Sequence, residues 1–310
     1  MIIRGTIIKG TITAQSVNMQ GLIIVNQSNE LNVNKIRRFF EEAPKLDVEL
    51  SVLTNDGTLA RIENGDIITD IQTDFIIYLD KDIYLAKMLE KKGFVLFNDA
   101  NFLKTCDDKT LTYIALANNG IKMPLTMSAP LIYQKELKEE NYLFLDKVIE
   151  TIGLPLVAKR VYGSLGQEVH LINNKDELRN FYANNFTEPL EFQEYISSSY
   201  GRSIRVLVID HKIFGAFERF NTKDFRSNFH GTADGKKIEL DELQVNFVNK
   251  IIKIMDIRYA GIDLLFGKDG PILCEVNSNA FFDVFEKVTG KNVAFEYLKM
   301  IKKIMEEKRG

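Results

Sequence analysis

Residues 260–277, AGIDLLFGKDGPILCEVN, carry the most informative pattern in the chain. Two apolar runs flank a glycine-rich turn at 267–271, which predicts two antiparallel strands joined as a hairpin. Asp263 lies among apolar neighbours in the first run. Glu275 and Asn277 lie two residues apart in the second run, so a strand places both side chains on one face.

The three oxygen-bearing side chains of this hairpin predict a metal site. Two carboxylates and an amide on an apolar sheet need a compensating cation. Oxygen ligands without histidine or cysteine favour Mg²⁺, with Mn²⁺ as an alternative, over zinc. A shared ion requires Asp263 opposite Glu275 with 267–271 as the loop, whereas a four-residue loop would place Asp263 opposite Cys274. A solvated outer face of the sheet is the alternative interpretation.

The bulk composition is typical of a soluble protein with several domains. A chain of 310 residues is too long for one ordinary core and favours two or three domains. The net charge of −3 argues against a surface built for nucleic acid. Two cysteines, no signal-peptide core and no apolar run long enough for a bilayer favour a cytoplasmic location.

Strand and helix patterns divide the chain into three parts. Residues 1–105 alternate the two patterns and predict a small doubly wound domain. Residues 106–189 predict a central α+β subdomain that begins with a helix from about Asp108 to Gly120. Residues 190–310 predict a mostly antiparallel subdomain. The expected fold class is therefore α/β and α+β multidomain, and the absence of a low-complexity linker predicts parts that pack around a shared cleft.

Several cations and glycines precede the hairpin. Lys159 lies inside an apolar strand, where a lysine is unusual unless it pairs with an anion or extends to solvent. The next loop contains Gly163 and Gly166, which let backbone amides approach phosphate, although an ordinary hairpin loop is as consistent with them. Arg205 lies in another apolar strand, where a buried guanidinium favours phosphate or carboxylate. Lys109, in the first turn of a helix, is by itself typical of a surface residue.

A predicted loop at 226–230 contains a cation, a hydroxyl and an amide, which suits a bound anion and a solvated turn equally well.

From about residue 107 to the C-terminus, these features together resemble the RimK-type ATP-grasp ligases, the family of the ribosomal protein S6 glutamate ligase. The matching blocks are Asp108-Lys109, Leu156 to Lys159 with its glycine loop, Gln193 to Ile196, Ile204-Arg205, Asp224 to His230, Gly261 to Asp263 and Glu275 to Asn277. The first hundred residues match only in architecture.

The resemblance implies a small doubly wound N-terminal domain followed by a two-part ATP-grasp fold, and it implies roles for three groups of residues. The group that binds ATP is Lys109, Lys159, Gly163, Gly166, Gln193, Glu194, Tyr195, Ile196 and Ser203. The group that lines the γ-phosphate and acyl-phosphate region is Arg205, Arg226 and Asn228. The group that binds two Mg²⁺ ions is Asp263, Glu275 and Asn277.

The reaction implied by the resemblance is ATP-dependent ligation of a carboxylate to an amine through an acyl phosphate, with ADP and phosphate as by-products. The expected partners are an amino acid such as L-glutamate and an acceptor that bears an amine or a carboxylate, namely a peptide, a protein tail or a small metabolite. No nucleic-acid or membrane partner is expected, and a homo-oligomer is left open. A catalytically silent ATP-binding regulatory module is the alternative function.

Two positions depart from the family pattern. Relatives often carry an aspartate where this chain has Ser203, and a small Ser-Pro-Gly turn where it has residues 278–282, Ser-Asn-Ala-Phe-Phe. The nucleotide and metal residues are retained, so the departures concern the substrate. We expect the bulkier segment 278–282 to border the acceptor pocket, and we do not extend ribosomal-protein glutamylation to this chain.

Overall fold

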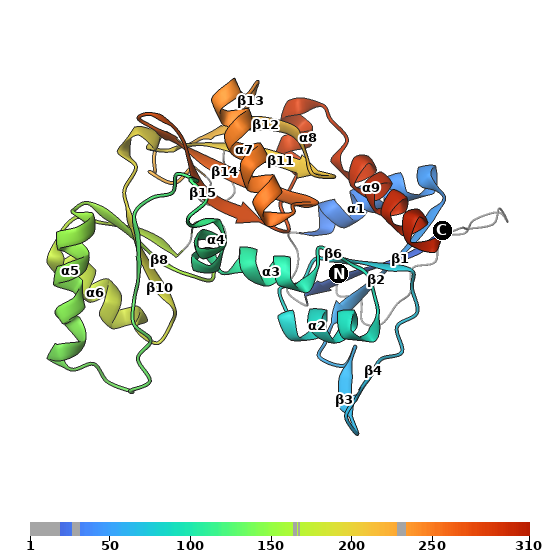
Figure 1. Cartoon of the computed structure of the whole chain (residues 1–310), viewed down its shortest axis with the longest axis horizontal. Coiled ribbons are helices and arrows are strands. Elements are labelled where there is room, and N and C mark those ends of the chain that lie inside the picture. Colours follow the sequence, from blue (N-terminus) through green and yellow to red (C-terminus); the bar gives the residue numbers. More distant parts are fainter. Residues whose placement is uncertain (1–18, 27–31, 164–165, 167, 228–233) are drawn as a thin grey trace.

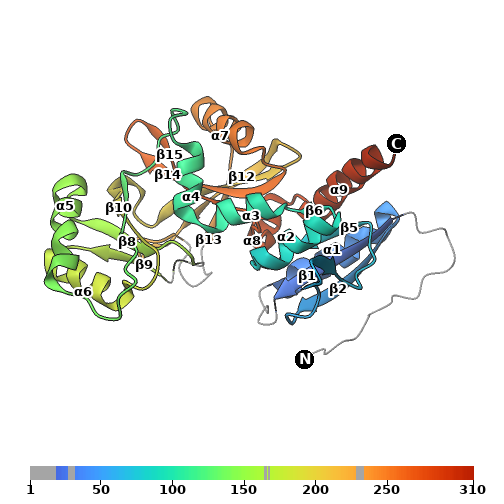
Figure 2. The ribbon, with the colours of Figure 1, turned by 60° about the horizontal axis from the view of Figure 1, so that its bottom comes forward.

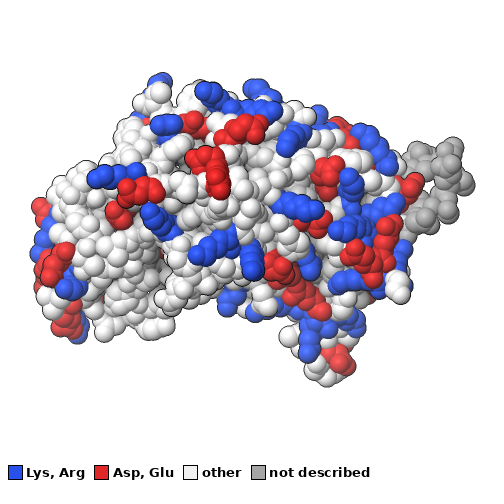
Figure 3. Space-filling model, turned by 45° about the horizontal axis from the view of Figure 1, so that its top comes forward, with Lys and Arg blue, Asp and Glu red and all other residues white. Residues whose placement is uncertain are grey.

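The computed structural model describes residues 19–26, 32–163, 166, 168–227 and 234–310. These residues form three lobes (Figures 1 and 2). The middle lobe contains a five-stranded sheet and lies between the other two lobes. On the face shown in Figure 3, basic and acidic side chains are interspersed, and no continuous basic patch covers that face. No helix in the described ranges is long and apolar enough to cross a membrane.

The N-terminal domain is built on a four-stranded parallel sheet with the order β2-β1-β5-β6. Asp82 caps the helix α2 by accepting hydrogen bonds from the N–H groups of Tyr84 and Leu85, and Gly93 ends it at a φ of 105°. The elements are β1 (Met19–Asn26), α1 (Val33–Glu42), a 3₁₀ turn (Ala43–Leu46), β2 (Val48–Asn55), β3 (Arg61–Glu63), β4 (Asp66–Ile68), β5 (Phe75–Tyr78), α2 (Ile83–Lys92) and β6 (Leu96–Phe97).

Both faces of this sheet are covered by helices, so the predicted doubly wound arrangement is confirmed. Ile24 and Ile76 share a core with α2 and α3 (Ala100–Asp107). Ile23 and Ile77 point the other way and share a core with α1 and with α9 (Val293–Arg309), the last helix of the chain. The C-terminal helix therefore completes the N-terminal domain and ties it to the sheet in the middle of the molecule (Figure 1).

The central subdomain has an antiparallel sheet with the order β7-β10-β8-β9. The predicted division at residue 189 stays a prediction. Because β10 pairs with β7 and β8, we propose that the boundary follows Glu194. The elements are α4 (Lys109–Leu116), β7 (Thr126–Ser128), a 3₁₀ turn (Glu139–Tyr142), α5 (Leu143–Ile152), β8 (Leu156–Arg160), β9 (Val169–Ile172), α6 (Lys175–Asn185) and β10 (Leu190–Glu194).

The C-terminal subdomain has an antiparallel sheet with the order β13-β12-β11-β14-β15. Val206 and Ile262 pack with Ile251 of α7 on one face, while Leu207 and Phe217 on the other face join the core shared with α1 and α9. The elements are a 3₁₀ turn (Ser197–Ser199), β11 (Arg202–Ile209), β12 (Lys212–Phe220), β13 (Asp234–Ile238), α7 (Glu242–Met255), β14 (Tyr259–Gly267), β15 (Gly270–Asn277) and α8 (Asp283–Thr289).

Two sequence predictions differ from the structure around α3 and α4. Helix α3 was not predicted, and α4 ends at Leu116 instead of near Gly120. Asp99 caps the start of α3, and Asp108 accepts a hydrogen bond from the N–H of Leu111 at the start of α4. Two acidic caps close together in sequence therefore divide this segment into two short helices.

The β14–β15 hairpin places Asp263 opposite Glu275 as predicted, but its turn and its strand register differ from the prediction. Its turn is tight, with Gly267 opposite Gly270, so the predicted loop at 267–271 is wrong. Continued without interruption, this register would place Asp263 opposite Cys274. A β-bulge shifts the register by one residue, and Asp263 lies opposite Glu275 as predicted.

Candidate nucleotide and metal site

A row of charged and polar side chains crosses the sheet face opposite α7. Ser203 lies opposite Arg219, Arg205 lies opposite Asp263, and Asp263 lies opposite Glu275. Because alternate residues of a strand share a face, these side chains project from the same side of four neighbouring strands. We call this set the polar row; its members are Ser203, Arg205, Arg219, Asp263, Glu275 and Asn277.

Asp263 is the centre of the polar row and is shared by two arginines. Its side chain is 1% exposed. Nε and Nη2 of Arg205 donate to its two oxygens, and Nη2 of Arg219 lies 2.7 Å from Oδ2. Burial by itself would raise the pKa of the Asp263 carboxyl, but the two guanidiniums hold that pKa well below its usual range. The sequence analysis missed Arg219, although its place in an apolar strand is the signal that singled out Arg205.

Ser203 connects the polar row to the loop that carries Arg226. Nε and Nη2 of Arg219 donate to Oγ of Ser203 at 3.1 and 3.0 Å, and the hydroxyls of Ser203 and Ser227 share a hydrogen bond of 2.6 Å. All three side chains are buried. Ser203 therefore has protein partners, and its predicted contact with ATP stays a prediction.

Lys159 is buried beside a carboxylate that the sequence analysis missed. Its Nζ lies 2.9 Å from Oε1 of Glu191, the residue opposite it on β10. Thr110 donates to the other oxygen of Glu191 at 2.8 Å, and the ring of Tyr113 lies 5.7 Å from Nζ. Burial favours the neutral amine, but Tyr113 and Glu191 outweigh it and raise the pKa of Lys159. The ammonium is therefore charged and fixed in position.

The glycine loop is held by cations from two sides. Nζ of Lys109 donates to the carbonyl oxygens of Val161 and Gly163, each at 3.0 Å. Nη1 of Arg226 donates to the carbonyl of Gly166 at 2.7 Å. Burial lowers the pKa of Lys109, and the neighbouring charge of Glu275 opposes that effect. Cations from α4 and from the C-terminal subdomain thus converge on the loop predicted to meet phosphate.

A pocket of about 490 Å³ opens beside the end of β10. Glu194, Tyr195 and Ile196 line it together with Met123 and the turn of the β14–β15 hairpin. Gln193 is not among the lining residues, because its side chain is buried and donates to Oγ1 of Thr126 at 2.8 Å. The pocket thus gathers three residues of the group predicted to bind ATP, and that role stays a prediction.

A direct contact joins α4, the helix that carries Lys109, to β15, the strand that carries Glu275 and Asn277. The hydroxyl of Tyr113 on α4 donates to the carbonyl of Cys274 on β15. The charges of Lys109 and Glu275 also interact. The predicted residues of the central and C-terminal subdomains therefore face one another, whereas Asn228 and His230 lie outside the described residues.

The three oxygen donors predicted for the metal lie on neighbouring strands, but the carboxylate of Asp263 is already bound by two arginines. Glu275 and Asn277 are partly exposed neighbours on β15, and the Asn277 amide donates to Oε1 of Glu275 at 3.1 Å. In the described ranges no group of three or more His, Cys, Asp and Glu side chains has the arrangement of a metal site. Two carboxylates and an amide fit a hard divalent cation. Direct ligation by Asp263 requires the exchange of an arginine contact for the ion.

Gly201 fixes the loop that carries Arg226. Its φ is +61°, its N–H donates to the carbonyl of Phe225, and its carbonyl accepts from the N–H of Asn221. A Cβ here would lie 2.0 Å from the carbonyl oxygen of Asn221. We expect Gly201→Ala to lower the free energy of unfolding by about 2–4 kcal/mol in chemical denaturation. Gly57→Ala is the control, with a φ of +83° and no atom within 4 Å. Equal losses in the two variants would contradict a steric role for Asn221.

Three comparisons show which known proteins this chain is similar to. A family model described as a RimK-like ATP-grasp domain matches residues 106–301. An uncharacterized protein of Mycoplasma genitalium is 31% identical over 280 residues, which cover 88% of this chain and 95% of that protein. Human N-acetylaspartylglutamate synthase A is 30% identical over 217 residues, which cover 69% of this chain and 54% of the synthase. The fold is shared with a RimK-domain ATP-grasp protein of Sphaerobacter thermophilus, at a TM-score of 0.70 and 17% identity, over 91% of this chain and 99% of that one.

Proposed function

Because the chain belongs to the RimK-like ATP-grasp family and is an ATP-grasp ligase, we propose that it joins a carboxylate to the amine of an amino acid, with ADP and phosphate as products. Ligases of this family use ATP with a divalent metal ion. The convergence of Lys109 and Arg226 on the glycine loop, next to the buried ammonium of Lys159, is the observation that carries the proposal. Three cations from two subdomains suit the charge of a triphosphate.

The proposed reaction has two transfers. A carboxylate oxygen of the acid attacks the γ-phosphorus of ATP, the bond between that phosphorus and the bridging oxygen breaks, and ADP leaves with the electron pair. The amine nitrogen then attacks the acyl carbon, phosphate leaves, and the nitrogen loses a proton as the amide forms. Such chemistry depends on positioning and charge neutralisation.

Each group of residues has a proposed role in these transfers. Mg²⁺, with Mn²⁺ as an alternative, would neutralise phosphate oxygens from a site at Asp263, Glu275 and Asn277. Glu194, Tyr195 and Ile196 would hold adenine, with Gln193 behind them. The residues proposed to bind phosphates are Lys109, Lys159, Gly163 and Gly166, with Ser203 beside them, and those proposed to line the acyl phosphate are Arg205, Arg226 and Asn228.

L-Glutamate is the proposed amine. The name of the human relative, N-acetylaspartylglutamate synthase, supports a glutamate-containing product. It also suggests N-acetyl-L-aspartate as a first acid to test.

Cys106 and Cys274 are both free thiols, which supports the proposed cytoplasmic location.

We expect the purified protein to release ADP slowly with ATP and Mg²⁺ alone and faster when a suitable acid and L-glutamate are both present. ADP and phosphate should form one for one with the amide, and hydroxylamine should trap the activated acid as a hydroxamate. Formation of AMP and pyrophosphate would contradict the mechanism. ATP binding without stimulation by any acid or amino acid would favour the silent regulatory module.

A further inference from the structure

Lys35 on α1 is a buried cation that no role described so far requires. Its side chain is 2% exposed. Nζ donates to the carbonyl oxygen of Asn279 at 3.0 Å and lies 4.9 and 5.8 Å from the ring centres of Phe281 and Phe282. In the described ranges no carboxylate lies within ion-pair distance of it. A lysine is almost never fully buried without a partner, so its presence here calls for an explanation.

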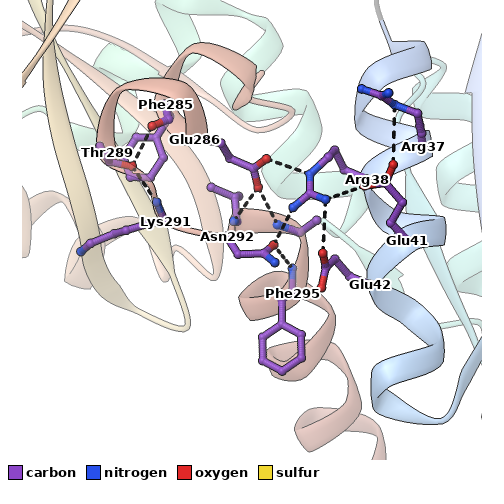
Figure 4. A network of polar contacts seen from close by, with 12 residues as sticks. Arg37, Arg38, Glu41, Glu42, Phe285, Glu286, Thr289, Lys291, Asn292 and Phe295 are labelled. Atoms are coloured by element: carbon purple, nitrogen blue, oxygen red, sulfur yellow. Dashed lines mark hydrogen bonds and ion pairs between the residues drawn. The ribbon is translucent and has the colours of Figure 1, made fainter.

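The position of Lys35 is fixed by the rest of α1. One turn further along, Arg38 donates to Glu286 of α8 at 2.9 Å and to Asn292, the cap of α9, at 3.1 Å (Figure 4). Phe39 packs against the ring of Phe282 at 5.8 Å. These contacts hold α1 against the C-terminal subdomain and keep the backbone of Lys35 next to segment 278–282.

Lys35 lies beside the reaction site. Asn279 follows the metal-site residue Asn277 by two positions, in the segment that we expect to border the acceptor pocket. Arg205 of the polar row is close enough to repel the ammonium of Lys35, and the carboxylate of Asp283 at the start of α8 attracts it. The N-terminal domain thus contributes a cation to the edge of the site.

The two phenylalanines beside Lys35 differ in a way that provides access. Phe282 is 1% exposed and belongs to the core, whereas Phe281 is 38% exposed and lies over Nζ from the outside. Neither residue is part of a helix or strand. A rotation of the Phe281 side chain would uncover the ammonium without unpacking Phe282.

The surroundings of Lys35 favour a bound anion. Burial lowers the pKa of Lys35 to about 7, with Asp283 opposing that effect and Arg205 adding to it. A carboxylate at hydrogen-bond distance would restore the full charge and form a charge-assisted hydrogen bond in a poorly solvated place.

We propose that Lys35 binds a carboxylate of the acid substrate that does not take part in the reaction, reached when the ring of Phe281 moves aside. The inference rests on the proposed ligase function and narrows its substrate class to acids with a second carboxylate. Specificity for the acid would then depend on a residue of the N-terminal domain, outside the matched family domain.

The test compares two acids that differ by one carboxylate, N-acetyl-L-aspartate and N-acetyl-L-alanine, with hydroxylamine as the nucleophile. We expect Lys35→Met to raise KM for N-acetyl-L-aspartate about 10- to 100-fold, the effect of losing one hydrogen bond to a charged group. KM for N-acetyl-L-alanine, KM for ATP and kcat should change little. Lys35→Arg should recover part of the loss, and Lys92→Met, at an exposed position of α2, should have no effect.

A purely structural lysine gives a different result. Its removal would lower the melting temperature and leave the preference between the two acids unchanged, which would overturn the proposal. We expect the melting temperature of Lys35→Met to be unchanged or raised, because a desolvated ammonium is removed.

Calorimetric titration of the ADP- and Mg²⁺-loaded protein with N-acetyl-L-aspartate and with citrate separates this inference from the proposed function. If the protein binds an acid, Lys35→Met weakens that binding and neither acid is activated, the carboxylate site is supported and the proposed activation of these two acids is contradicted. Absence of binding of both acids to the wild-type protein would overturn the carboxylate site.

Discussion

The double variant Lys159→Met with Glu191→Gln is expected to fold normally and to lose turnover by a factor on the order of 10²–10³, the effect of removing one preorganised electrostatic contact. Methionine keeps most of the apolar stem of the lysine, and glutamine keeps an acceptor for the hydroxyl of Thr110. The pair is buried, so both charges are removed together and neither is left alone. Turnover at saturating ATP and chemical unfolding should be measured on the same preparation.

The single variant Lys159→Met serves as the control for folding. It leaves Glu191 as a buried charge without its ammonium, and such a loss typically costs about 3–5 kcal/mol of unfolding free energy. Low activity of the single variant would therefore not distinguish a phosphate contact from poor folding. Near-normal turnover of the stable double variant would show that Lys159 has only a structural role.

Asp263→Asn is expected to lower both turnover, by a factor on the order of 10³, and stability, by about 3–5 kcal/mol at neutral pH. The carboxylate is the shared partner of two buried arginines and a proposed metal ligand. Asparagine keeps the size of the side chain and removes the charge. Asp256→Asn is the matched control, because Asp256 is exposed and its left-handed backbone, at a φ of 52°, tolerates asparagine.

The stability effect of Asp263→Asn should depend on pH. The pKa of Asp263 is lowered in the folded protein, whereas the unfolded value is about 4. The carboxylate therefore contributes stability above about pH 4, and the contribution declines as the pH falls below that value. The difference in unfolding free energy between wild type and variant should narrow between about pH 5 and pH 2. A difference that stays constant over this range would contradict the arginine-pair account.

The parts of the site that the sequence predicted are those with a local signal. Asp263, Lys159 and Arg205 are charged residues inside apolar strands, and a single strand is enough to make them conspicuous. Glu191 and Arg219 are also charged residues inside apolar strands and could have been selected on the same ground. Their pairing with Lys159 and Asp263 could not have been predicted, because it requires the strand order, which the local pattern does not contain.

Lys35 had no such signal. It lies in an amphipathic helix where a lysine normally reaches solvent, and it is buried by Asn279 and Phe281, more than two hundred residues away in the chain. The division into α3 and α4 depends on which acidic residues cap a helix. Packing of both helices determines that these are Asp99 and Asp108. Burial by distant segments is thus the information that the sequence analysis lacked.

The bulge beside Cys274 makes the length of this hairpin adjustable. The part of the hairpin next to the turn and the part next to Asp263 differ in strand register by one residue. The bulge is the extra residue on β15 that produces this shift. A turn that gained one residue could dispense with the bulge and still leave the two carboxylates face to face. The loop that lines the pocket beside β10 can therefore differ in length, and so change the shape of that pocket, while Asp263 and Glu275 stay opposite each other.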